Sequence, residues 1–303
     1  MSLKSTAAGK RALISMHLSV LLWGLTGVLG RGINLSEGYL VWYRIMIASV
    51  TLGIYAVLTK RFVLPSKRDG LKMTGIGVLL TVHWLFFYGA IKYSNISITL
   101  SMLASQALFT VFFEYLILRK PIAKSEIVFS LMAMAGIWII FYSEQIFLTG
   151  IILAIIASGV GSLFNILNKP ILETNEPVMV SLIEIGTGFL FLTCVLPFYT
   201  SFFGIEKVFP NSTDWMLLFI LAFFCTHLTL ILSLSALKYL DAFTLNLSIN
   251  LEPIYGIALA FFLYNEHKVL NYRFFIGGLL ILFSVLMHGY YQAKKVKQSA
   301  EIY

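Results

Sequence analysis

The sequence predicts an all-α polytopic membrane protein with ten transmembrane helices. Hydrophobic residues make up 59% of the 303-residue chain and charged residues only 12%, whereas soluble domains are about 45–50% apolar and about 25% charged. Long apolar runs recur along the chain, each near the roughly 20 residues that a helix needs to cross a hydrocarbon core. This composition excludes a soluble domain, a secreted disulfide scaffold, a disordered chain and a soluble nucleic-acid binder.

Ten apolar runs account for the predicted helices. Each mixes large apolar residues with small ones that allow membrane helices to approach closely, and none shows the alternating pattern of a membrane β-barrel. The first run follows three basic residues, as in a signal peptide, but nine more runs follow and no clear cleavage site is present, so we expect a retained helix. The predicted spans are 12–29, 37–59, 71–92, 95–118, 125–142, 148–168, 177–199, 214–237, 241–264 and 271–291.

Basic residues predict the orientation of these spans. Ten crossings put both termini on one side; if that side is the cytoplasm, 16 of the 22 Lys and Arg residues lie on the inner side and five on the outer side. Cytoplasmic segments are enriched in Lys and Arg, so we expect a multi-pass protein of the cell (inner) membrane with cytoplasmic termini. The Lys-rich tail at 294–297 is better suited to anionic lipid headgroups than to nucleic acid.

The chain also contains an internal repeat. Residues 89–95 (GAIKYSN) match 235–241 (SALKYLD) at an offset of 146, and the same register places Gln106 opposite Glu252. Nearer the start of each half the offset is 138. The shared order of spans and loop lengths indicates a duplication.

We expect the two repeats to comprise residues 1–146 and 147–303, with five helices each. Five is an odd number, so the second repeat must enter the membrane from the opposite side, and a two-fold axis in the membrane plane relates the halves. Inverted repeats are typical of alternating-access transporters, which bind substrate near the midplane at the repeat interface. The pattern favours transport over the alternative, a duplicated structural scaffold.

Motifs in several spans carry a further indication. They are Trp23-Gly24, Arg44, His83-Trp84-Leu85-Phe86-Phe87, the Ala-x-Lys-Tyr sequences at 90 and 236, Leu251-Glu252-Pro253, Asn265-Glu266 and Gly277-Gly278. In this order they resemble the EamA-type family of the drug/metabolite transporter superfamily, apparently a bacterial branch, over essentially the whole chain. Family members often carry a Glu at the end of the fourth span, where this chain has Lys120. The resemblance implies transport of amino acids, nucleotide-linked sugars, cofactor-like metabolites or drugs.

Polar side chains near the span centres are the candidate substrate or proton pathway. An ionisable residue within a bilayer costs roughly 2.5–3.5 kcal/mol on insertion scales and by default marks a functional position. At about 1.5 Å per residue, His83, Gln106, His227 and Glu252 lie within about 3 Å of the midplane. The two-fold axis should bring Gln106 and Glu252 to opposite walls of one cavity.

Glu252 is followed by Pro253, which removes a backbone donor and frees a carbonyl in the preceding turn. Desolvation favours the neutral form of a buried carboxyl, so Glu252 is suited to exchange a proton or to bind a substrate amine. The alternative is a protonated Glu that is hydrogen-bonded to a neighbouring helix.

Arg44 and Glu184 each lie about eight residues into their spans but at different depths, so we expect them to face different vestibules rather than to pair. Arg44 either captures a carboxylate or phosphate bidentately or snorkels to the surface. Glu184 either serves as a gate or coupling residue or pairs with a Lys of the inner loops. Histidine has an unperturbed pKa near neutrality, so His83 and His227 are either interhelical hydrogen-bonders or proton relays.

Three further residues complete the candidate site. Asn250 shares the ninth span with Glu252 but lies on a different face, so one of these faces meets the cavity and the other a neighbouring helix. Trp84 and Tyr255 lie on spans that carry the polar candidates and would suit a small amphipathic metabolite. The alternative is that such aromatic residues contact lipid.

The motif inventory separates the function classes. No HExxH, GxSxG or Walker sequence is present, so a membrane enzyme or an ATP-driven pump is not expected. Cys194 and Cys225 lie in apolar runs, and no His pair or carboxylate cluster suggests a metal or cofactor. We therefore expect a secondary transporter, an exporter of small metabolites such as amino acids with proton coupling as an option, that acts in the lipid bilayer as a monomer or homodimer. A passive channel or scramblase, and nucleotide-like or drug substrates, are the alternatives.

Overall fold

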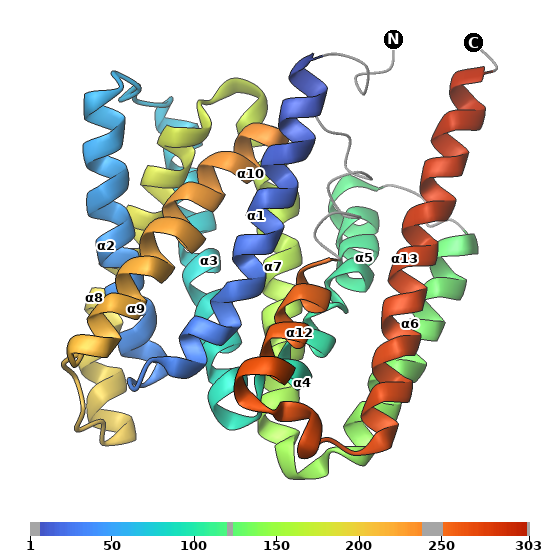
Figure 1. Ribbon diagram of the computed structural model, residues 1–303. Coiled ribbons are helices and arrows are strands. Elements are labelled where there is room, and N and C mark those ends of the chain that lie inside the picture. Colours follow the sequence, from blue (N-terminus) through green and yellow to red (C-terminus); the bar gives the residue numbers. More distant parts are fainter. Residues whose placement is uncertain (1–6, 120–123, 238–250, 302–303) are drawn as a thin grey trace.

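The computed structural model describes residues 7–119, 124–237 and 251–301. These residues form a bundle of helices in which the start of α1 (Ala7–Gly32) and the end of α13 (Tyr272–Glu301) lie at the same end (Figure 1). We call this the terminal end and the opposite end the distal end. An even number of membrane crossings places the two ends of a chain on the same side.

The remaining elements follow the predicted spans. They are α2 (Glu37–Leu58), α3 (Lys67–Tyr93), α4 (Ile96–Leu103), α5 (Gln106–Leu118), α6 (Lys124–Ser143), η2 (Gln145–Phe147), α7 (Leu148–Thr174), α8 (Pro177–Phe203), α9 (Ser212–Ala222), η3 (Phe223–Leu228), α10 (Thr229–Leu237), α12 (Glu252–Tyr264) and η4 (Glu266–Lys268).

The predicted fold class is confirmed. Among the described residues, seven helical segments are long and apolar enough to cross a membrane, and three shorter apolar helices cover 127–143, 252–264 and 272–284. The fourth span consists of α4 and α5, and the eighth consists of α9, η3 and α10. Only the end of the predicted ninth span, from Leu251, lies in the described part of the chain. The chain is an all-α multi-pass membrane protein.

Helices α5 and α12 begin at matching positions of the two halves. The fourth span is interrupted at Ala104–Ser105, so that α5 begins at Gln106. The helix α12 begins at Glu252, 146 residues later, and both helices have 13 residues. Both also end in a left-handed residue, at Arg119 and Asn265, each with φ of 53°.

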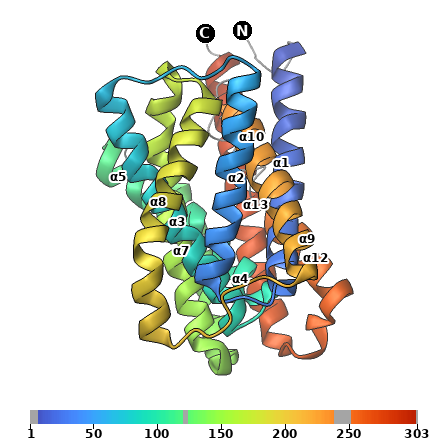
Figure 2. The ribbon, with the colours of Figure 1, turned by 90° about the vertical axis from the view of Figure 1, so that its left-hand side faces the viewer.

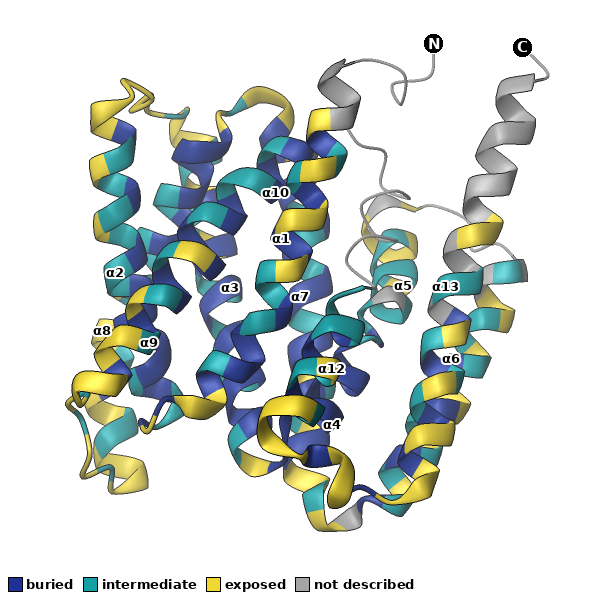
Figure 3. Cartoon of the chain, in the orientation of Figure 1, coloured by how far each residue is buried: buried dark blue, intermediate teal, exposed yellow. Residues whose placement is uncertain are grey.

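Small residues set the packing at the centre of the bundle. Helix α3 contacts α1, α2, α4, α7 and α8, and Figure 3 shows buried residues concentrated on α3, α4 and α7. Gly77 of α3 lies against the backbone of Glu184 in α8, where any larger side chain would collide. Close approach through glycine is a common way for membrane helices to gain packing contacts.

Helices α6 and α13 form a second packing unit along one side (Figures 1 and 2). A Cβ atom added to Gly136 would lie 2.6 Å from the carbonyl oxygen of Gly277, and one added to Gly277 would lie 2.7 Å from that of Gly136. The two backbones are therefore in direct contact at this crossing.

Candidate functional site

A central cavity lies between helices of both halves of the chain. It contains about 930 Å³ of empty space, its open mouth included. Five candidates from the sequence line it: Arg44, His83, Trp84, Gln106 and Glu252. Aromatic and aliphatic side chains form much of the remaining wall, among them Trp23, Phe87, Phe164 and Leu230.

Arg44 is the central cation of this cavity. Its side chain is buried, with 2% of its surface exposed, so it does not snorkel to the surface. Its Nε donates to Thr226 Oγ1 at 2.7 Å, its Nη1 to the Tyr88 hydroxyl at 2.8 Å and its Nη2 to the Cys225 carbonyl at 3.3 Å. The guanidinium also lies over the Trp84 ring, 4.1 Å from its centroid. All these partners are formally neutral.

A π-helical turn presents two of the three acceptors to Arg44. The turn covers Phe223–Leu228 in the middle of the eighth span. The helix caps Ser66 and Asn211 are 145 residues apart, whereas Gln106 and Glu252 are 146 apart, so the second half has one extra residue between these points. A π turn accommodates such an insertion, and π turns are frequent at functional sites.

Gln106 and Glu252 occupy corresponding positions at the starts of α5 and α12 and both line the cavity. Pro253 occupies the first turn of α12, where a missing N–H disrupts no helical hydrogen bond. Discontinuous helices of this kind form substrate sites in transporters. Among the described residues, the Glu252 carboxyl forms no ion pair with Arg44, although both groups line the same cavity.

His83 is fixed by the neighbouring helix α7. Its Nδ1 lies 2.8 Å from the Ala157 carbonyl, and a carbonyl only accepts, so Nδ1 is the protonated nitrogen and Nε2 of the neutral ring is an acceptor. Gly161 makes room for this arrangement: a Cβ there would lie 2.9 Å from Nδ1 and 3.3 Å from Gln106 Oε1. His83 and Gln106 therefore meet at one glycine of α7.

Three other candidates lie outside the cavity lining. The His227 Nδ1 contacts Thr51 Oγ1 at 3.0 Å, as expected of an interhelical hydrogen-bonder. Glu184 is fully buried at the packing surface of α8, and Tyr255 packs its Cβ toward Gly24. Asn250 lies outside the described residues.

The neutral polar side chains that line the cavity were not among the candidates predicted from the sequence. Thr226, Thr229 and Ser233 line one side of the cavity, and Thr26 and Asn165 line others. The first three follow an i, i+3, i+7 pattern, which places them on one helix face. That stripe was the available signal, but single hydroxyl groups are common in membrane helices and do not stand out by charge.

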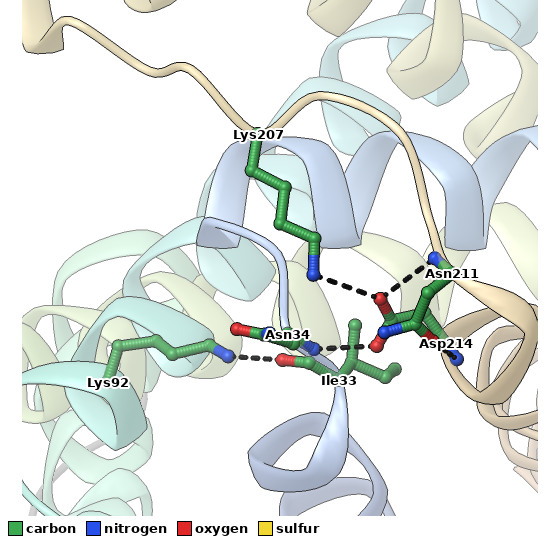
Figure 4. A network of polar contacts seen from close by, with 6 residues as sticks. All are labelled: Ile33, Asn34, Lys92, Lys207, Asn211 and Asp214. Atoms are coloured by element: carbon green, nitrogen blue, oxygen red, sulfur yellow. Dashed lines mark hydrogen bonds and ion pairs between the residues drawn. The ribbon is translucent and has the colours of Figure 1, made fainter.

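Polar contacts tie the helices together at the distal end (Figure 4). Lys92 Nζ donates to the Ile33 carbonyl at 2.5 Å, and the Asn34 backbone N–H donates to Asp214 Oδ1 at 2.8 Å. Lys207 Nζ lies 3.5 Å from the other oxygen of Asp214. These contacts join the ends of α1, α3 and α9 around one buried carboxylate.

Glu266 makes a second set of contacts at the distal end. Its carboxylate accepts from the backbone N–H groups of Ile96 at 3.0 Å and Ser97 at 2.8 Å, and from the Ser97 hydroxyl at 2.6 Å. Glu266 thus caps the start of α4, where a negative charge is favoured by the helix dipole. Its place in the motif Asn265-Glu266 has a structural explanation.

Comparison with known proteins agrees with this architecture. The EamA-like transporter family matches the chain twice, at residues 10–142 and 148–290.

This chain belongs to the EamA-like transporter family.

A protein of Bacillus subtilis (strain 168) described as "Uncharacterized transporter YxxF" is 23% identical over 256 residues, which cover 82% of this chain and 80% of that protein. A solved crystal structure that is 16% identical has a TM-score of 0.65 and covers 95% of this chain and 99% of its own; it is similar in fold.

Membership makes the chain a membrane transporter, whose substrate is a small molecule and whose environment is the lipid bilayer. In an EamA-like transporter, the cavity built around Arg44 and Glu252 offers a cation, an acid and aromatic walls to a solute. In the described residues, no group of three or more His, Cys, Asp or Glu side chains could hold a metal ion.

Proposed function

We propose that this EamA-like transporter is a secondary active exporter of small zwitterionic metabolites such as amino acids and works by alternating access. The observation that carries the proposal is the buried Arg44 guanidinium, which faces the cavity without a carboxylate partner among the described residues. It is not proposed to be an enzyme.

The energetics of Arg44 favour an anionic ligand. Burial of a cation costs several kcal/mol unless a charge of opposite sign compensates it. Thr226, Tyr88 and the Cys225 carbonyl position the guanidinium but carry no formal charge. A substrate carboxylate would supply the missing charge and match the fork of guanidinium donors.

Glu252 provides the complementary group for an amine. It lines the same cavity as Arg44, so an ammonium group at Glu252 and a carboxylate at Arg44 would belong to one zwitterion. Trp23, Trp84 and Phe87 supply apolar surface for the rest of the solute. A nucleotide-like metabolite or a drug would use the aromatic walls but would not need both charged groups.

We further propose that residues 1–146 and 147–303 are inverted repeats that move against each other. The support is the double family match, the equal length and corresponding start of α5 and α12, and the left-handed residues that end both helices. Inverted-repeat transporters bind substrate at the interface of the repeats, and the cavity is lined by residues of both halves.

The distribution of basic residues supports a location in the inner membrane with cytoplasmic termini. In that orientation the Asp214 contacts close the outer side, while the cavity extends to Met16 and Ser233 in the terminal halves of their spans. A monomer and a homodimer are both compatible with this arrangement.

The test is counterflow of radiolabelled amino acids in proteoliposomes. We expect saturable exchange that unlabelled amino acids inhibit and that amino-acid amides, which lack the carboxylate, inhibit weakly. Flux that does not saturate would replace the proposal with a passive channel or scramblase. Exchange of nucleotides or drugs without exchange of amino acids would replace the zwitterionic substrate class.

The export direction needs a separate comparison in cells. Cells with the gene should release more of the transported amino acid and tolerate higher concentrations of it than cells without the gene. Reduced tolerance together with faster accumulation would indicate import instead.

A further inference from the structure

Glu184 is a buried carboxyl group for which the proposed substrate site has no use. It lies on α8 with 0% of its surface exposed, and neither Oε1 nor Oε2 has a hydrogen-bond partner. An ionised carboxylate cannot be held in this way without a large desolvation cost. The geometry is that of a neutral, protonated carboxyl.

Other polar atoms beside Glu184 also lack partners. Asn168 of α7 lies against Glu184, yet its Oδ1 and Nδ2 are buried and no hydrogen bond of normal geometry joins the two side chains. The Ser181 hydroxyl, one helical turn before Glu184, is likewise buried and unpartnered. A protonated carboxyl and an amide are complementary, because each has one donor and one acceptor to offer the other.

Charged groups near Glu184 are engaged elsewhere. Helices α2, α3, α7 and α10 pack against α8. Gly77, the residue of α3 at the same level, brings no side chain. The described part of α10 has no titratable residue. No ion pair to Glu184 occurs among the described residues.

The titratable side chains closest in register have other contacts. Arg44 binds Thr226 and Tyr88, His83 binds the Ala157 carbonyl, and His227 binds Thr51. The Tyr55 ring packs against His227, Lys72 pairs with Asp69 at 3.6 Å, and Lys169 is exposed. A bound proton is therefore the cation that neutralises Glu184. Unlike a larger cation, a proton requires no cavity beside the carboxyl group.

The position of Glu184 indicates when that proton could leave. Glu184 is the eighth residue of α8 and Arg44 is the eighth residue of α2, so the two are equivalent under the proposed duplication. Arg44 lines the cavity and Glu184 does not. If the inverted repeats exchange conformations, Glu184 takes up surroundings equivalent to those that Arg44 has in this structure. Glu184 then gains access to the cavity.

We propose that Glu184, beside the amide of Asn168, is a proton-binding site outside the substrate cavity that couples proton movement to the conformational exchange. An O–H bond forms on one carboxylate oxygen when Glu184 takes a proton from water, and it breaks when the proton returns to water in the alternate conformation. The coupling role rests on the transport function proposed above, whereas the binding of the proton does not.

Proton binding is tested without substrate, by infrared difference spectroscopy of the reconstituted protein during a pH titration. The C=O band of a protonated carboxyl should be present in the wild type and in the control Glu206→Gln, whose exposed side chain lies in the loop before α9. Glu184→Gln should lose that band and Glu252→Gln should keep it. Asn168→Ala should shift its frequency, because the polar amide beside the carboxyl is removed. An unchanged band in Glu184→Gln overturns the site.

Coupling is tested in proteoliposomes that contain the pH dye pyranine. An amino-acid gradient should drive proton flux in the wild type, and Glu184→Gln should lower that flux about tenfold or more, within the usual range of coupling between sites. Amino-acid counterflow by the same variant should continue. Equal loss of counterflow and proton flux would indicate a structural role only, and unchanged proton flux would overturn the coupling.

Two outcomes separate this inference from the proposed function. If wild-type vesicles exchange no amino acid, the transport proposal fails, and with it the coupling, while the infrared band still decides whether Glu184 binds a proton. If Glu184→Gln is not monodisperse in detergent, Asn168→Ala retains the carboxyl and must show both the shifted band and the reduced proton flux.

Discussion

Arg44 combines full burial, a cation and exclusively neutral protein partners in one side chain. Three hydrogen bonds and the Trp84 ring hold the guanidinium in a single orientation before any solute arrives. A preorganised cation loses little side-chain entropy when it binds an anion. Its geometry suits recognition of a planar carboxylate.

Arg44→Lys should weaken transport of a carboxylate-bearing substrate while the positive charge is retained. Lysine cannot reproduce the fork of donors, and the loss of hydrogen bonds to a charged group costs about 1.5–3 kcal/mol. That range corresponds to an increase of roughly ten- to 100-fold in KM for counterflow. Arg273→Lys, on an exposed residue at the distal end, is the matched control and should leave KM unchanged. An unchanged KM in Arg44→Lys would remove Arg44 from the binding site.

Glu266→Ala should destabilise the fold. The substitution leaves the buried N–H groups of Ile96 and Ser97 without their acceptor, and each unsatisfied buried donor costs about 1–3 kcal/mol. We expect a clear fall in the Tm measured in detergent. Glu206→Ala, on an exposed carboxylate of the distal loop, should leave the Tm nearly unchanged. Equal Tm values for both variants would contradict the capping role.

At the residue scale, the sequence predicted depth in the membrane better than direction. Counting along each span brought His83, Gln106 and Glu252 to the level of one cavity, and the structure places all three in its wall. The same count selected His227, which contacts Thr51 instead. Depth depends on position along one helix, whereas the direction of a side chain depends on how several helices pack, and a single sequence does not contain that information directly.

Interruptions of the helices are the main feature at the scale of elements. The break before Gln106, the start of α12 at Glu252 and the π turn at Phe223–Leu228 all occur beside the cavity. Irregular backbone is tolerated within a membrane only where protein or a water-filled cavity surrounds it. The π turn brings the backbone carbonyl of Cys225 into contact with Arg44, whereas a regular helix would present only side chains to the cavity.

The number and order of the spans followed from apolar runs and their length, but the interruptions did not. Pro253 is a visible cause of the helix start at Glu252, whereas the interruption at Ala104–Ser105 contains no proline or glycine. The π turn results from one extra residue, which becomes visible only when the helix caps of the two halves are compared. Local propensity thus predicts elements, and tertiary packing decides where they are interrupted.

Gly77→Ala should separate packing from helix propensity in α3. A Cβ at Gly77 would collide with the Glu184 carbonyl, whereas one at Gly75 would meet nothing within 4 Å. Overpacking costs about 1–3 kcal/mol, so Gly77→Ala should lower the Tm in detergent. Gly75→Ala in the same helix should be neutral or stabilising by up to about 1 kcal/mol. Similar Tm changes in the two variants would show that α3 and α8 do not approach closely at Gly77.

At the scale of the whole molecule, the contacts at the distal end and the cavity determine which side is open. Asp214, Glu266 and the Tyr199–Glu37 hydrogen bond of 2.7 Å join helices at the distal end. The cavity extends from Thr26 toward Ser233, which lies near the terminal end of α10. We interpret the structure as a conformation closed at the distal end, in which breakage of the Asp214 contacts would favour the alternate state.

Thiol accessibility tests directly whether the cavity opens alternately to the two ends of the bundle. The background is the double variant Cys194→Ser and Cys225→Ala, which must retain counterflow. Into it we introduce Ser233→Cys or Thr26→Cys and label each variant with a membrane-impermeant maleimide from each side of oriented vesicles. We predict that Ser233→Cys reacts from the terminal side and Thr26→Cys is protected from the distal side. Addition of Asp214→Asn should increase labelling of Thr26→Cys from the distal side and decrease that of Ser233→Cys from the terminal side. A continuous pore would allow Ser233→Cys to react from the terminal side and Thr26→Cys from the distal side at the same time, with no reciprocal change on addition of Asp214→Asn. That result would contradict alternating access.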